Sequence, residues 1–97
     1  DQDKKIYIIC GMMNNKIHDK FLSNFKQVSE IVVIDIPNNK NCIKKEALKK
    51  IIEKIGVKTE ASNSIQDAIK YIANKDRNSI ILIVGSIFLI GEVLNLN

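Results

Sequence analysis

The apolar positions along the chain change their period several times, and each change predicts a new secondary-structure element. Short, continuous apolar runs are typical of strands that a parallel sheet buries on both faces. The first run is followed by Gly11, and the second, broken only by Asp35, is followed by the turn residues Pro37-Asn38-Asn39. Four strands are expected in this way, over residues 6–10, 31–36, 57–61 and 80–84.

Apolar residues spaced three and four apart predict helices that alternate with these strands. The clearest helix is expected at 44–55, where an apolar stripe runs through charged residues and Gly56 follows as a helix-ending residue. Ser64, with Asp67 three residues later, resembles a capping box at the start of another helix. In all, helices are expected over residues 18–26, 44–55, 65–73 and 87–94.

This alternation of strands and helices is the signature of an open α/β sheet with right-handed crossovers. We therefore predict a Rossmann-like three-layer α/β sandwich with about four mainly parallel strands and helices on both faces. The 97 residues suit a single domain. Sheets of this kind bind ligands beyond the carboxyl ends of their strands. Those ends fall at residues 11–16, 35–39, 62–63 and 85–86.

Composition and charge narrow the classes of function. The net charge of +4 comes from lysines scattered among acidic residues, with Arg77 as the single arginine, so we expect no nucleic-acid partner. The longest uncharged stretch, 78–91, is shorter than the roughly 20 residues that span a bilayer. With no signal pattern at the N-terminus, we expect a cytoplasmic protein without a membrane partner. Cys10 and Cys42 are then expected as reduced thiols.

Candidate ligand-binding residues follow the predicted strands. Ser86 either caps the last helix or offers its hydroxyl beside free backbone N–H groups that attract a carboxylate or phosphate. Lys16 either reaches an anion at the same edge or is a solvated surface lysine. Asp35 either holds a ribose hydroxyl or begins the turn before Pro37. The sequence contains no phosphate loop, complete dinucleotide fingerprint or nucleophile elbow, and His18 is its single histidine.

Two segments carry a family resemblance. The first strand runs into Gly11-Met12-Met13-Asn14-Asn15-Lys16, and the last runs into G-S-I-F-L-I-G-E-V at 85–93. The second segment fits the more specific pattern V-G-S-[aliphatic]-[aromatic]-L-x-G-E. Together they make the chain resemble, over nearly its whole length, the C-terminal domain of the folylpolyglutamate synthase/dihydrofolate synthase branch of the Mur ligase family.

The resemblance implies an ATP-dependent amide ligase, which activates a carboxylate as an acyl phosphate before an amine displaces the phosphate. It implies that a separate N-terminal or central ATPase domain is the partner of this chain. ATP and Mg²⁺ are then bound in the full-length enzyme, and the fragment alone is expected to bind no cofactor and to be inactive. Glutamate and folate are the implied small-molecule partners.

By position, the resemblance places Ser86 and Gly85 at the glutamate site, and Lys16 and Asn15 near the nucleotide. The segment Asn15-Lys16-Ile17 lacks the two acids that flank the lysine in the family's D-K-D-like segment. The resemblance assigns no catalytic residue and no metal ligand to this chain.

The chain at 1–97 also differs from the family's domain, which begins with one additional strand and helix. We expect that difference to leave an apolar strand edge unpaired, so that the chain forms a homodimer, swaps elements with another copy or is marginally stable. The alternative interpretation is a stand-alone Rossmann-like binding or interaction module without catalytic activity.

Overall fold

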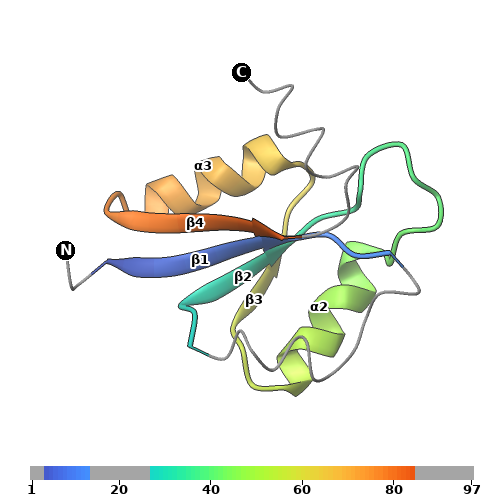
Figure 1. Cartoon of the computed structure of the whole chain (residues 1–97), viewed down its shortest axis with the longest axis horizontal. Coiled ribbons are helices and arrows are strands. Elements are labelled where there is room, and N and C mark those ends of the chain that lie inside the picture. Colours follow the sequence, from blue (N-terminus) through green and yellow to red (C-terminus); the bar gives the residue numbers. More distant parts are fainter. Residues whose placement is uncertain (1–3, 14–26, 85–97) are drawn as a thin grey trace.

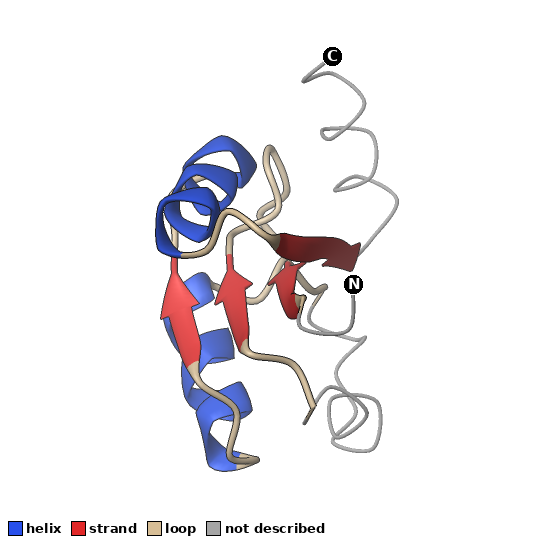
Figure 2. Ribbon diagram, turned by 90° about the vertical axis from the view of Figure 1, so that its left-hand side faces the viewer, coloured by secondary structure: helices blue, strands red, loops and turns tan. Residues whose placement is uncertain are grey.

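A computed structural model describes residues 4–13 and 27–84 of the chain. Its four strands form one parallel sheet in the order β3-β2-β1-β4, and one helix packs on each face, α3 above and α2 below in the views of Figure 1 and Figure 2. The predicted fold class is therefore confirmed. The elements are β1 (Lys5–Cys10), β2 (Glu30–Val33), α2 (Lys45–Lys54), β3 (Thr59–Ala61), α3 (Ile65–Lys75) and β4 (Ser79–Val84).

The sheet separates two apolar clusters, because successive side chains of a strand point to opposite faces. Alternate residues of β1 and β2 therefore contribute to different clusters. On the α2 face the buried cluster consists of Ile8, Cys10, Met12, Ile31, Val33, Ile43, Leu48, Ile52 and Val57. On the α3 face it consists of Tyr7, Ile9, Val32, Ile34, Ile65, Ala68 and Ile72.

The two described helices begin and end close to their predicted limits. The last turn of α2 is followed by Gly56 with φ +91°, a left-handed conformation that glycine adopts without steric cost. At the start of α3, the hydroxyl of Ser64 accepts a hydrogen bond of 3.0 Å from the N–H of Asp67, which confirms the predicted cap. The helices expected at 18–26 and 87–94 lie outside the described residues.

The limits of the strands differ more from the predicted ones than the limits of the helices do. The second predicted strand, 31–36, is wrong at its carboxyl end, because β2 ends at Val33. Ile34 still donates a backbone hydrogen bond of 3.0 Å to Cys10, and the chain then turns away over Asp35. The apolar run continues to Ile36 because that side chain is also buried, although its backbone is not part of the sheet. The short strand expected at 57–61 is confirmed at 59–61.

The carboxyl ends of β1, β2 and β4 meet at Gly11. Its N–H donates to the carbonyl oxygen of Val84 at 3.2 Å. A Cβ atom at this position would lie 3.0 Å from Cγ1 of Ile36 and 3.3 Å from the carbonyl oxygen of Ile34. Glycine is therefore favoured here by the close approach of two neighbouring segments.

Both cysteines are buried and unpaired, as predicted. Burial raises the pKa of Cys10 to about 12, because the thiolate is poorly solvated there. Among the helices of the described residues, none has the length and apolar character needed to cross a membrane.

Candidate functional site

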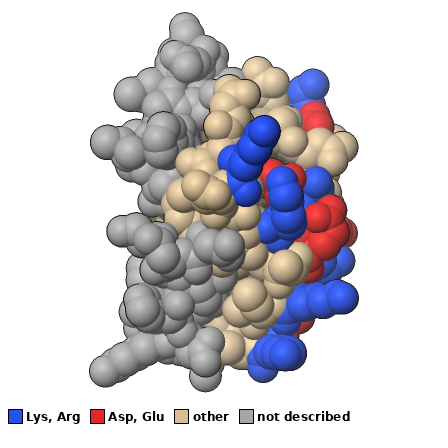
Figure 3. All heavy atoms as spheres, turned by 90° about the vertical axis from the view of Figure 1, so that its right-hand side faces the viewer, with Lys and Arg blue, Asp and Glu red and all other residues tan. Residues whose placement is uncertain are grey.

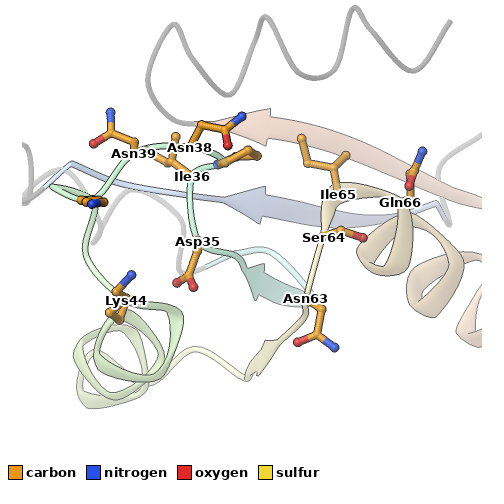
Figure 4. A pocket seen from close by; sticks show the side chains of 11 residues that line it. Asp35, Ile36, Asn38, Asn39, Lys44, Asn63, Ser64, Ile65 and Gln66 are labelled. Carbon is orange, nitrogen blue, oxygen red and sulfur yellow. The ribbon is translucent and has the colours of Figure 1, made fainter.

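A cavity of about 680 Å³ lies beyond the carboxyl ends of β2 and β3 (Figure 4). It opens between the loop that leads from β2 to α2 and the loop that leads from β3 to α3. Both loops belong to the edge where the sequence predicts ligand binding in a parallel sheet. The lining residues are Asp35, Ile36, Pro37, Asn38, Asn39, Lys40, Lys44, Asn63, Ser64, Ile65 and Gln66.

Asp35 fixes one wall of the cavity by capping α2. Its Oδ1 atom accepts a hydrogen bond of 2.7 Å from the backbone N–H of Lys45, and its Oδ2 atom lies 3.6 Å from Nζ of Lys45. The N-cap residue itself, Lys44, provides no side-chain acceptor, so Asp35 satisfies a donor that the first turn leaves free. The negative charge of Asp35, with smaller contributions from Glu46, raises the pKa of Lys45.

The sequence leaves two roles open for Asp35: it holds a ribose hydroxyl, or it begins the turn before Pro37. The residue does precede the turn at Pro37, but its carboxylate is held by α2, ten residues further along the chain. The side chain remains 35% exposed and lines the cavity. One face of the carboxylate can therefore still meet a ligand.

The turn after Asp35 shapes the rim. Asn38 has φ 58°, a left-handed conformation that asparagine adopts more readily than most residues. The side-chain oxygen of Asn39 accepts a hydrogen bond of 2.9 Å from the N–H of Asn41, which closes a local turn. Lys40 and Lys44 follow at the rim with exposed side chains.

The opposite wall is the start of α3, where Asn63, Ser64 and Gln66 contribute polar side chains (Figure 4). Ser64 satisfies the N–H of Asp67, whereas the N–H groups of Ile65 and Gln66 belong to the first turn and have no acceptor within the helix. These groups carry the partial positive charge of the helix N-terminus.

The chemistry of this lining is suited to binding rather than to bond breaking. Asp35 is the single carboxylate among the lining residues, and it is already engaged by α2. The lining offers amides, a hydroxyl and two lysines, which can hydrogen-bond a polar ligand that carries anionic oxygens. Within residues 4–13 and 27–84, no group of three or more histidine, cysteine or acidic side chains is placed to hold a metal ion.

The four site residues named from the sequence, Asn15, Lys16, Gly85 and Ser86, lie outside the described residues. The strands that precede them are adjacent, since Cys10 is paired with Val84 in the parallel register of β1 and β4. The predicted strand ends include the cavity residues 35–39 and Asn63. Lys40, Lys44 and the first turn of α3 were not predicted to line the cavity.

A second polar cluster, which the sequence analysis did not identify, lies at the amino end of β2. Glu30 is only 1% exposed. Its carboxylate accepts hydrogen bonds of 2.7 Å from the hydroxyl of Tyr71 and 2.6 Å from Nζ of Lys75.

Glu30 raises the pKa of Lys75 well above its ordinary range, and burial raises the pKa of Tyr71. The proximity of Lys75 lowers the pKa of Lys58. Glu30, Tyr71 and Lys75 hydrogen-bond to one another, which fits a structural role.

The parallel sheet defines a Rossmann-like α/β domain, and the cavity at its carboxyl edge is its candidate site. Two solved structures of folylpolyglutamate synthase from Mycobacterium tuberculosis share this fold. The structure complexed with ADP and AMPPCP matches with a TM-score of 0.79 and 20% sequence identity. The structure complexed with ADP matches with a TM-score of 0.75 and 17% identity.

Each match covers 95% of this chain and 23% of the synthase chain, so the chain spans about a quarter of the enzyme that it resembles. The resemblance stated from the sequence is thereby confirmed at the level of the fold. No family model and no curated protein matches the sequence.

Proposed function

We propose that the chain is the C-terminal, accessory domain of an ATP-dependent amide ligase of the folylpolyglutamate/dihydrofolate synthase type, which adds glutamate to folate or dihydropteroate. One observation carries the proposal. The motif at 84–92, read from the sequence, and the backbone match over 95% of the chain lead to the same enzyme. A shared fold by itself leaves many functions open, so the agreement with the motif is what favours this one.

In this proposal, the reaction centre belongs to the partner ATPase domain, because the 97 residues contain no phosphate loop. ATP bound there with Mg²⁺ supplies the phosphoryl group that activates the carboxylate. The present chain binds and orients the reactants at the edge of its sheet and helps to exclude water from the cleft. Like the partner domain, it would function in the cytoplasm.

Two sets of residues would perform these tasks. Ser86 and Gly85 contact glutamate, and Lys16 and Asn15 contact the anionic part of the nucleotide. The adjacent carboxyl ends of β1 and β4 support this assignment, since these strands lead directly to both pairs of residues. The cavity beside Lys44 and Ser64 supplies further hydrogen-bonding groups at the same edge. Lysine and backbone donors suit carboxylate and phosphate oxygens.

The proposal is tested by titrating the isotope-labelled 97-residue chain with glutamate and, separately, with ADP, while amide resonances are followed by NMR. Glutamate at millimolar concentration is expected to shift the resonances of Gly85 and Ser86. ADP is expected to leave the spectrum unchanged, because the nucleotide site requires the partner ATPase domain. Ser86→Ala is expected to abolish the glutamate response.

Ser29→Ala is the matched control, because Ser29 is an exposed serine at the amino end of β2, away from the ligand edge. It should leave both titrations unchanged. If glutamate shifts no resonance, or if Ser29→Ala weakens the glutamate response as much as Ser86→Ala does, the accessory-ligase function is wrong. The stand-alone binding or interaction module would then be favoured.

A further inference from the structure

The large apolar side chains that remain exposed among the described residues gather at one place. Ile6, Ile80 and Leu82 are 37%, 42% and 48% exposed. In the register of β1 and β4, Ile6 is paired with Ile80 and Ile8 with Leu82, so the three exposed side chains are neighbours. They occupy the α2 face of the sheet, but α2 packs mainly over β2 and β3. We call these three residues the β4 patch.

The β4 patch adjoins the edge at which the described sheet ends. Among the described strands β4 is the outermost on its side, and it pairs with β1 along its full length without a break in register. Its sequence, Ser79-Ile80-Ile81-Leu82-Ile83-Val84, contains no charged residue and no proline. Proteins usually protect an edge strand with such residues, with a bulge or with a covering element.

The opposite edge of the same sheet has these protections. There β3 is only three residues long and carries Glu60, whose Oε1 atom lies 3.5 Å from Nζ of Lys49 on α2. In the view of Figure 3, basic and acidic side chains lie next to one another on the described part of the surface. Of the two edges of the described sheet, the β4 edge is therefore the one without charged residues.

We propose that β4 is an interface for a second copy of this chain, with the two β4 strands paired antiparallel about a twofold axis perpendicular to the sheet. This arrangement keeps the α2 faces of both copies on the same side, so the Ile80 and Leu82 side chains of one copy lie beside those of the other. In a twofold contact a charged side chain near the axis meets its own like-charged copy. The absence of charge in β4 makes it compatible with that symmetry.

The size of the contact limits the apolar area that the association can bury. A strand of six residues is about 20 Å long. The pairing of two such strands with their apolar neighbours is small beside stable interfaces, which bury about 1,200–2,000 Å². We therefore infer a weak dimer that forms reversibly as the protein concentration rises.

Sedimentation equilibrium of the full 97-residue chain, from about 10 μM to about 1 mM, covers the range in which weak dimers form. The average mass of the wild type is expected to rise from 11.0 kDa toward twice that value. Leu82→Lys and Leu82→Glu should each remain at 11.0 kDa, because their like charges meet across the axis. An equimolar mixture of the two variants should regain the association. Ala73→Lys, at an exposed position of α3, is the control and should behave as the wild type.

Several outcomes contradict the proposal. A wild type that keeps the monomer mass throughout the range overturns it, as does association that survives in Leu82→Lys. A mixture of the lysine and glutamate variants that stays monomeric also overturns it, while circular dichroism of each variant verifies the fold. If the wild type is monomeric alone but hydrogen exchange at β4 slows when an ATPase domain of the ligase is added, the edge belongs to that partner instead.

Discussion

Replacing Asp35 by alanine is expected to destabilise the protein by about 1 kcal/mol, the usual cost of losing a side-chain acceptor at a helix start. The carboxylate accepts a hydrogen bond of 2.7 Å from the N–H of Lys45, and the N-cap residue offers no substitute. The ion pair with Nζ of Lys45 is partly exposed and adds little. For a domain of this size, a loss of about 1 kcal/mol lowers the melting temperature by roughly 4–8 °C.

The measurement is thermal unfolding followed by circular dichroism at 222 nm, the usual helix signal, with the transition analysed as two-state. Asp35→Asn separates the cap from the charge, because its amide oxygen can still accept the hydrogen bond. It should retain most of the stability. Ser64→Ala removes the equivalent cap of α3 and should cost about as much as Asp35→Ala. An unchanged melting temperature for Asp35→Ala, or an equal loss for Asp35→Asn, would refute the capping argument.

Three further predictions concern the core and the buried polar cluster. Tyr71→Phe removes a hydrogen bond of 2.7 Å to the buried carboxylate of Glu30 and should lower the free energy of unfolding by about 1.5–2 kcal/mol in urea titrations; a value near zero would contradict the role of Tyr71 in that cluster. Gly11→Ala places a Cβ atom 3.0 Å from Cγ1 of Ile36 and should cost about 1–2 kcal/mol in the same assay, whereas equal stability would mean that the neighbours move freely. For Cys10, the unfolded thiol ionises near its ordinary pKa of 9.0 and burial raises the folded pKa to about 12. The unfolded state therefore loses its proton first, so the free energy of unfolding should fall as the pH rises from about 9 to 12, and Cys10→Ala should show a smaller fall over that interval.

The sequence predicts best the elements that bury only one side, because the spacing of their apolar residues then follows the geometry of the helix. In α2 and α3, the apolar stripes face the two clusters of the core, and the helix ends carry local signals at Gly56 and Ser64. The end of β2 is predicted less well. Ile34 and Ile36 are buried like strand residues, but burial does not require that their backbone stay in the sheet.

The contacts that the sequence does not reveal are those between distant residues. Glu30 meets partners 41 and 45 residues away, and Asp35 caps a helix that begins ten residues later. A glutamate before an apolar run gives no sign that it will be 1% exposed. The approximate position of the cavity could be predicted, because the loops after β2 and β3 lie at the carboxyl ends of adjacent strands. The α3 wall could not be predicted, because it depends on how closely the two loops approach each other.

The strand order also determines when the fold can be completed during translation. β1, β2 and β3 precede β4 along the chain, so a three-stranded core with α2 can emerge from the ribosome before β4 does. The pairing of β1 with β4 joins residues separated by most of the described sequence, the kind of contact that slows folding. Because β4 adds to the outside of the sheet, this late step does not require the earlier strands to separate. Until β4 emerges, the side of β1 that pairs with β4 has no partner strand in the nascent chain, and a chaperone that binds extended segments would bind there.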